Sequence, residues 1–403
     1  GRTLTTRMRL GMFDPPGMVP YASIPASVID CDAHRDLARR AAVQSFVLLK
    51  NEKNILPLRP ETTRKIMLIG PFATDMHVLL GNYSGMSRRM VTFQEGLVGG
   101  TPEGIRVAAR MGFLPDRPNP NPFDWALGDA LNSDVVVACV GTSVLYESEE
   151  GDAILSEHKG DRLALELSAP QAEYIKKLAL NGAKVILVVT GGSPVLLTGV
   201  EEYVQAILYA WYPGEEGGNA LADVLFGRLS PSGKLPITFP KHTSDLPPFD
   251  DYSMAGRTYR YSAVEPLYPF GFGLGYTTFA YRDLKLSAAT LEAGSPLAVR
   301  ATATNTGATA GAEVVQLYLS DLEASAPVPI HKLVGFQRVE LGPGESREVA
   351  FTLTAEAMSF FDEEGNLRLE PGEFRVTVGG CSPSERGQAL GAPEPVTGVF
   401  TLR

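Results

Sequence analysis

Four continuous apolar segments, each rich in branched residues, constrain the fold of the first part of this chain more than any other feature. They are KIMLIG at 65–70, SDVVVACVG at 133–141, AKVILVVTGG at 183–192 and VQAILYAWYPG at 204–214. Uninterrupted apolar runs of this length are typical of strands that are buried on both faces. Segments with helical spacing lie at 169–182 and 217–227. This alternation predicts an α/β sandwich, a mostly parallel sheet with helices on both faces.

The segment before the first of these strands has a different period. Its apolar residues recur at helical spacing, at Leu37, Ala41, Ala42, Phe46 and Leu49. This spacing predicts a helix that begins with Asp32 as its N-cap and continues to about Lys50.

The chain changes character from about Tyr276. Apolar and polar residues alternate in short segments separated by turn residues, at 297–307, 312–321, 346–358, 367–380 and 397–403. About seven short strands of this kind predict an all-β sandwich of the immunoglobulin or fibronectin type III class. No Cys–Trp–Cys pattern accompanies the strands, which disfavours an antibody-type domain.

Composition excludes several classes of partner. The net charge of the 403 residues is −10. This charge disfavours a nucleic acid as a partner, because binding to its phosphates needs a basic face. No apolar run reaches the roughly 18 residues that span a bilayer, so we expect a soluble protein that does not enter membranes. Three scattered cysteines and five scattered histidines form no metal-ligand spacing, so the sequence predicts no metal and no cofactor.

Several long motifs together resemble glycoside hydrolase family 3, most closely its bacterial β-xylosidases and β-glucosidases. They are AAVQSFVLLKNEKNILPL at 41–58, IGPFATD and LLGNYSGM within 69–86, WYPGEEGGNALADVLFGRLSPSGKLPITFP at 211–240, RTYRYS and PLYPFGFGLGYTTF within 257–279, and HKLVGFQRVELGPGE at 331–345. The resemblance runs in order from about residue 7 to residue 403.

The resemblance implies a domain layout. Residues 1–36 correspond to the end of a (β/α)8 barrel and a linker, 37–240 to an α/β sandwich domain, 241–275 to a connector and 276–403 to a fibronectin type III-like domain. The barrel, about 250 residues in a typical fold, has no counterpart here, and the family's nucleophilic aspartate lies in it. We therefore expect a partner barrel, as a covalent neighbour or a separate chain.

An acidic loop follows the strand at 133–141. It reads YESEEGDAILSEHKGD at 146–161, and the carboxyl ends of parallel strands are where sites form. Retaining glycosidases use two carboxyl groups about 5–5.5 Å apart, and the acid/base needs a raised pKa, which neighbouring acids can supply. The resemblance implies that Glu149 is the acid/base, with Glu147 and then Glu150 as alternatives. Glu157 and Asp161 are expected to fix the loop or to pair with Lys159 and Arg162; the alternative for the whole loop is a solvated acidic surface.

The segment LLGNYSGMSRR at 79–89 follows the first strand and is expected at the same edge of the sheet. Tyr83 can stack on the apolar face of a sugar and Asn82 can bond its hydroxyls; an ordinary turn with a packing tyrosine is the alternative. Arg88 and Arg89 could hold residues of the acidic loop or could have no particular role. Glu215 and Glu216 are expected to be ordinary acids at a helix start.

Two functions from different classes follow. The first is the C-terminal part of a retaining, exo-acting β-glycosidase that hydrolyses β-linked xylo- or gluco-oligosaccharides and aryl glycosides, as a monomer or a homo-oligomer. The second is a non-catalytic remnant that binds carbohydrate or a partner.

The aromatic cluster of the connector is expected to form a seam between domains. Its members are Tyr259, Tyr261, Tyr268, Phe270 and Phe272.

Overall fold

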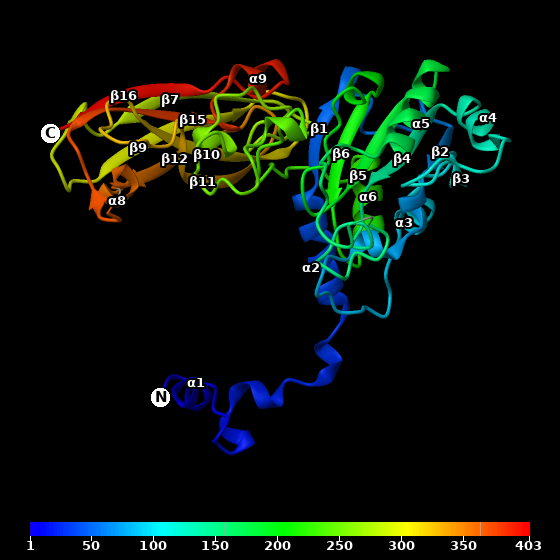
Figure 1. Ribbon diagram of the computed structural model, residues 1–403, viewed down its shortest axis with the longest axis horizontal. Helices are drawn as coiled ribbons and strands as arrows, with labels where there is room; N and C mark the ends of the chain where they lie inside the picture. The colour runs from blue at the N-terminus through cyan, green and yellow to red at the C-terminus, as the bar shows by residue number, and fades with distance from the viewer. Residues whose placement is uncertain (157, 363) are drawn as a thin grey trace.

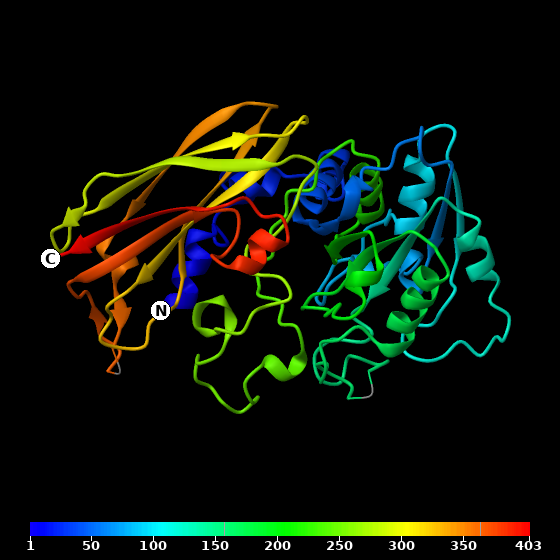
Figure 2. The ribbon, with the colours of Figure 1, turned by 90° about the horizontal axis from the view of Figure 1, so that it is seen from above.

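A computed structural model describes residues 1–156, 158–362 and 364–403. Figure 1 shows an α/β domain beside a β-sandwich, with the first residues forming an arm that extends away from both. The arm begins with helix α1 (Arg2–Arg9), none of whose residues is buried. Seen from above in Figure 2, the two domains lie side by side along the long axis of the molecule, and the connector fills the space between them.

The α/β domain contains six strands and five longer helices among its described residues. The strands are β1 (Val47–Asn51), β2 (Lys65–Ile69), β3 (Arg106–Arg110), β4 (Val135–Gly141), β5 (Val185–Thr190) and β6 (Ala206–Trp211). The helices are α2 (Asp32–Ser45), α3 (Phe93–Gly100), α4 (Trp125–Leu131), α5 (Ala169–Leu180) and α6 (Gly217–Leu225). The four apolar segments of the sequence are therefore β2, β4, β5 and β6.

The sheet has the strand order β1-β6-β5-β4-β2-β3. Strands β2 to β6 pair in parallel, and β1 pairs antiparallel with β6. The chain moves outward from β2 to β3 and then returns to place β4 on the other side of β2. Sheets of this type bind ligands outside the carboxyl ends of the strands at such a reversal. The loop after β4 is the acidic loop.

The predicted helix from Asp32 to Lys50 is confirmed as far as Ser45 and is wrong in its last five residues. Helix α2 ends at Ser45, and Val47 begins strand β1. Val47, Leu48 and Leu49 are all at most 1% exposed, because successive side chains of a strand enter the cores on both faces of the sheet. Asp32 is also the first helical residue rather than the cap, since Cys31 occupies the N-cap position.

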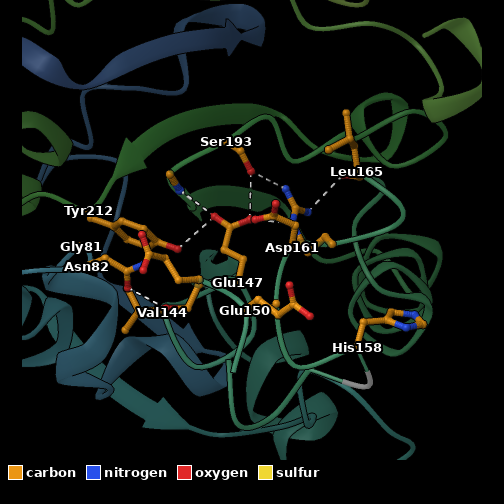
Figure 3. A pocket seen from close by; sticks show the side chains of 15 residues that line it. Gly81, Asn82, Val144, Glu147, Glu150, His158, Asp161, Leu165, Ser193 and Tyr212 are labelled. Atoms are coloured by element: carbon orange, nitrogen blue, oxygen red, sulfur yellow. Dashed lines mark hydrogen bonds and ion pairs between the residues drawn. The ribbon is translucent and has the colours of Figure 1, made fainter. Parts of the chain in front are cut away.

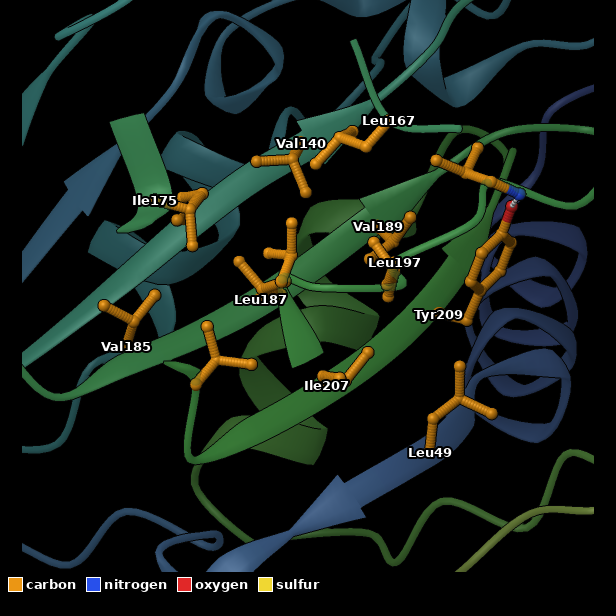
Figure 4. Packing of buried hydrophobic residues seen from close by; sticks show 14 of the residues in the cluster. Leu49, Val140, Leu167, Ile175, Val185, Leu187, Val189, Leu197, Ile207 and Tyr209 are labelled. Carbon is orange, nitrogen blue, oxygen red and sulfur yellow. Dashed lines mark hydrogen bonds between the residues drawn. The ribbon is translucent and has the colours of Figure 1, made fainter. Parts of the chain in front are cut away.

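Two apolar cores cover the two faces of the sheet. Along β4, Val136, Ala138 and Val140 enter one core, and the residues between them enter the other. Figure 4 shows the first core, where Ile175 of α5 packs toward the side chains of β4, β5 and β6. Helices α2, α3 and α6 cover the second face. This burial on both faces confirms the predicted α/β class and fixes the strand ends that carry the loops.

Two glycines permit close packing where strands end. Gly70, after β2, has φ +111°, and a Cβ there would lie 2.2 Å from the carbonyl oxygen of Cys139. Gly141, at the end of β4, has φ +122°, and a Cβ there would lie 2.0 Å from the carbonyl oxygen of Thr190. Only glycine fits both the backbone angle and the space, so these residues set where the chain leaves the sheet.

The second domain is a β-sandwich, as the alternating pattern predicted. One sheet has the order β11-β10-β15-β16-β8 and the other β12-β9-β7, and β13 pairs with β14. The strands are β7 (Phe279–Leu286), β8 (Thr290–Leu291), β9 (Leu297–Asn305), β10 (Gly311–Asp321), β11 (Lys332–Leu341), β12 (Ser346–Leu353), β13 (Phe360–Phe361), β14 (Leu367–Arg368), β15 (Gly372–Gly379) and β16 (Val396–Leu402). Short helices α8 (Ala355–Met358) and α9 (Glu385–Ala389) interrupt them.

The domains are joined by aromatic packing of the connector and by one nearly buried ion pair that runs directly from Lys234 of the α/β domain to Glu313 of β10. The connector contains the short helix α7 (Thr258–Tyr261). The ring of Tyr259 stacks on Phe270 at 4.2 Å and meets Tyr318 of β10 edge-on. Lys234 Nζ lies 2.9 Å from Glu313 Oε1, and both side chains are nearly buried. Part of the predicted aromatic cluster thus contacts the sandwich, whereas Tyr268 and Phe272 belong to the α/β core.

Candidate active site

The loops that follow β2, β4, β5 and β6 surround a cleft at the carboxyl edge of the sheet. Its volume is about 970 Å³. Residues 81–82 line it from the loop after β2, residues 147–150, 158 and 160–161 from the acidic loop, residues 192–193 from the loop after β5, and Tyr212 from the loop after β6. Four separate loops meet here because parallel strands all end at the same edge.

Glu147 is the most extensively bonded carboxylate of the cleft. Its Oε2 accepts from Arg162 Nε at 2.6 Å and from Ser193 Oγ at 2.9 Å. Its Oε1 accepts from the backbone N–H of Gly192 at 3.0 Å and from the Tyr212 hydroxyl at 3.1 Å. Figure 3 shows its carboxylate at the centre of these interactions. Both carboxylate oxygens are therefore occupied, which holds the Glu147 side chain in place.

Arg162 and Tyr212 complete this network. The Arg162 guanidinium also donates to Ser193 Oγ at 2.7 Å and to the carbonyl oxygen of Pro194 at 2.8 Å. Burial and the adjacent charge of Glu147 raise the pKa of the Tyr212 hydroxyl, so it remains a donor. The network ties the start of the acidic loop to the loops after β5 and β6.

Glu149 and Glu150 lie beyond this network, at the exposed tip of the loop. Neither forms an ion pair with any residue that the structure describes. The backbone carbonyl of Glu149 accepts from the N–H of Asp152 at 2.9 Å, which closes a turn at the tip. Both side chains line the cleft, and Glu150 points into open space in Figure 3. Together with the exposed Asp161, they are the cleft carboxylates that form no ion pair with the described residues.

Asn82 and Tyr83 lie beside the same loop. The Ser148 hydroxyl donates to Asn82 Oδ1 at 2.9 Å, so the loop after β2 contacts the acidic loop directly. Tyr83 is 85% exposed with φ +60°. The carboxylate of Glu149 is the main cause that raises the pKa of the Tyr83 hydroxyl. The sequence-based placement of both residues near the acidic loop agrees with this geometry.

Residues 46–276 match the family model of the glycosyl hydrolase family 3 C-terminal domain, and residues 313–382 match the fibronectin type III-like domain. The chain belongs to glycoside hydrolase family 3. A β-xylosidase of Formosa agariphila is 34% identical over 95% of this chain and 53% of its own length. The periplasmic β-glucosidase of Salmonella typhimurium is 34% identical over 93% of this chain and 52% of its own length.

Solved structures give the same relation. The β-glucosidase of Listeria innocua in complex with isofagomine covers all of this chain at a TM-score of 0.83 and 29% identity, and the match spans 54% of that enzyme. A family 3 exo-β-xylosidase in complex with a xylobiose aziridine probe matches with a TM-score of 0.85 at 27% identity. This chain spans about half the length of the relatives it matches, and it corresponds to their C-terminal portion.

Three expectations for charged residues of this family 3 chain were wrong. Arg88 and Arg89 pair with Asp30 and Asp32 at the start of α2, not with the acidic loop. Asp161 is exposed and makes no ion pair with described residues, since Arg162 turns instead to Glu147. Glu157, the other acid expected to fix the loop, lies outside the described residues.

The third concerns Glu215 and Glu216, which are more than acids at a helix start. Both pair with Arg35 of α2, and Arg35 and Glu216 are buried. Arg35 also binds Asp30. These pairs fasten α2 to the start of α6, and a buried arginine with carboxylates on several sides could not be inferred from the local sequence.

Sequence reasoning missed Ser193, Gly192 and Tyr212. The signal was present, because TGGSP and WYPG follow two predicted strands and such loops carry sites.

Among the described residues, no group of three or more His, Cys, Asp and Glu side chains is arranged to hold a metal ion. No helix in the described part of the chain is long and apolar enough to cross a membrane.

Proposed function

We propose that this chain is the C-terminal part of a retaining, exo-acting β-glycosidase and that Glu149 supplies its general acid/base. The observation that carries the proposal is the contrast within one loop. Glu147 is fixed by four donors, whereas Glu149 is exposed, lies in the cleft and is free of ion pairs with described residues. Catalytic carboxyls must remain free to exchange protons with substrate.

The reaction needs a second carboxylate from the barrel. In the first step the barrel aspartate attacks the anomeric carbon, and Glu149 gives its proton to the leaving oxygen as the glycosidic bond breaks. In the second step Glu149 takes a proton from water, which attacks the glycosyl-enzyme and releases the sugar with its configuration retained. The acid/base must therefore carry a proton in the first step and be ionised in the second.

The other cleft residues have supporting roles in this proposal. Glu147 and Arg162 position the root of the loop, and Glu150 is the alternative acid/base. Tyr83 offers an exposed ring to the sugar or its leaving group, and Asn82 fixes the loop through Ser148. β-Linked xylo- and gluco-oligosaccharides and aryl β-glycosides are the proposed substrates, in keeping with the names of the relatives.

The test joins this chain to a family 3 barrel, by fusion ahead of Gly1 or as a separate chain, and assays aryl β-xylosides and aryl β-glucosides. Glu149→Gln should lower kcat by roughly 10²–10⁴-fold for substrates with a poor leaving group. The loss should be much smaller for a good leaving group, and azide should restore activity by replacing the activated water. Glu150→Gln is the matched control and should retain most activity.

The alternatives give different results. If Glu150→Gln carries the loss and Glu149→Gln does not, Glu150 is the acid/base. Glu147→Gln should lower the thermal midpoint together with kcat and show no azide rescue, because its role is positional. A chain that confers no activity on any barrel would support the non-catalytic remnant instead.

A further inference from the structure

A second pocket, of about 380 Å³, lies where the connector meets the β-sandwich. We call it the sandwich pocket. Arg260 and Tyr261 of α7 line one side, Lys332 at the start of β11 another, and Phe360 and Phe361 of β13 a third. The pocket thus lies at the α8 side of the sandwich in Figure 1, away from the cleft of the α/β domain.

Arg260 has no partner for its charge in this pocket. Its Nε is buried and meets no acceptor, and its guanidinium makes no hydrogen bond or ion pair with the described residues. Its guanidinium carbon lies 5.7 Å from the centre of the Tyr261 ring. An arginine carries five N–H donors, and buried donors are nearly always satisfied. The missing acceptor is therefore an indication of a ligand.

The backbone holds Arg260 in this position. Its carbonyl oxygen accepts from the N–H of Ile330 at 2.6 Å. The adjacent Tyr259 is stacked on Phe270, and its hydroxyl accepts from the N–H of Leu333 at 3.2 Å. The turn is thus fixed between the domains, and a fixed donor loses little entropy when it binds.

Lys332 supplies a second cation to the same pocket. Its Nζ donates to the carbonyl oxygen of Ala357 at 3.1 Å, and it forms no ion pair with the described residues. Burial and the positive charge of Arg260 lower the pKa of Lys332, with Glu356 opposing them only in part. Glu356 also lines the pocket but forms no ion pair with either cation. Two cations that lack an ion-pair partner in a partly enclosed pocket favour an anion between them.

Asp321 lines this pocket but does not act as that anion. Burial raises the pKa of Asp321, and the charges of Glu370 and Glu323 add to this effect. A carboxylate paired with Arg260 or Lys332 would have its pKa lowered. The cations therefore lack a counter-ion from this neighbour.

We propose that the sandwich pocket binds a carboxylate-bearing ring compound, with uronic acid sugars as the fitting class. The carboxylate would lie between Arg260 and Lys332, where the planar guanidinium can donate two parallel hydrogen bonds. The apolar face of the pyranose ring would lie against Phe361, which is 69% exposed, and Tyr261. This site is separate from the glycosidase cleft and does not depend on the identity of its acid/base.

The experiment is calorimetric titration of the 403-residue chain with glucuronate, glucose and acetate. Glucuronate should bind saturably and glucose should not, since only the first carries a carboxylate. Acetate should bind more weakly than glucuronate because it lacks a ring. Arg260→Met and Lys332→Met should each weaken glucuronate binding by roughly 10- to 100-fold, the value of a hydrogen bond to a charged group.

Arg300→Met is the matched control. Arg300 is exposed on β9 of the same domain and pairs with Glu348, away from the pocket, so its loss should leave binding unchanged. Equal binding of glucose and glucuronate, absence of glucuronate binding, or full binding by both pocket variants would each overturn the proposal. If Arg260→Met fails to fold, Lys332→Met decides.

Discussion

Arg162 and Arg260 are partly buried arginines at the edges of two pockets, and they are treated in opposite ways. Arg162 donates to Glu147, Ser193 and two backbone carbonyls. The guanidinium of Arg260 donates to no acceptor among the described residues. The guanidinium of Arg162 therefore holds loops together, whereas the N–H donors of the Arg260 guanidinium remain available for a ligand.

The difference shows that a charged side chain can either fix the position of a loop, as Arg162 does, or remain available to bind a ligand, as we propose for Arg260. In the cleft, the paired charges of Glu147 and Arg162 fix the start of the acidic loop, whose exposed tip carries Glu149. In the sandwich pocket, the backbone of the connector holds Arg260 in position, and the charges of Arg260 and Lys332 form no ion pair with the described residues. Removal of a charge should therefore have opposite effects on stability in the two places.

The largest expected effect comes from Arg162→Met. It leaves the nearly buried carboxylate of Glu147 without its cation, which should lower the free energy of unfolding by roughly 2–3 kcal/mol. Arg260→Met should leave stability unchanged or raise it, because it replaces an unpaired charge by an apolar chain. Urea unfolding measured in parallel checks both.

A double variant tests whether the unpaired carboxylate of Glu147 causes the loss in Arg162→Met. Arg162→Met combined with Glu147→Gln should recover part of the loss, because no carboxylate is then left unpaired. Equal losses from Arg162→Met and Arg260→Met would show that Arg260 is structural, and the comparison would fail.

A smaller effect is expected for Tyr212→Phe. The substitution keeps the ring in place but removes the hydroxyl that donates to Glu147 Oε1. That oxygen then keeps one donor, the backbone N–H of Gly192. We expect a loss of about 1 kcal/mol in the free energy of unfolding. Tyr83→Phe is the control, since Tyr83 is exposed and should cost far less. A loss as large as that of Arg162→Met would mean that Tyr212 also packs the domain core.

Much of the fold could be predicted because its signals are local. The four apolar segments indicated β2, β4, β5 and β6, and the alternation after Tyr276 indicated the sandwich. Strand β1 was missed because FVLLKN continues the apolar positions of α2, and only its pairing with β6 decides between helix and strand. Strand β3 was missed because RVAAR lies partly exposed at the sheet edge and has no long apolar run.

The site was predictable as a place rather than as a set of contacts. The carboxyl-edge rule and the family resemblance led to the acidic loop, Asn82 and Tyr83. The bond between Glu147 and Arg162 spans fifteen residues and depends on how the loop folds back. The approach of Gly192 and Tyr212 to Glu147 depends on strand order, which no local pattern contains.

The smallest expected effect tests whether the pocket cations neutralise Asp321. Its pKa in the folded protein is raised above the ordinary value of 3.8, so its contribution to stability is fully present below that pH and is lost as the pH rises through the folded pKa. The stability of the wild type relative to Asp321→Asn should therefore fall as the pH rises from about 3.8 towards neutrality. Urea midpoints of both proteins across this range measure the difference. The charges of Glu370 and Glu323 raise the pKa of Asp321, whereas the backbone N–H of Glu323, which donates to Asp321 Oδ1, lowers it. Arg260 and Lys332 line the same pocket. If either cation did pair with Asp321, the difference would rise with pH instead, and the cations would no longer be free for a ligand.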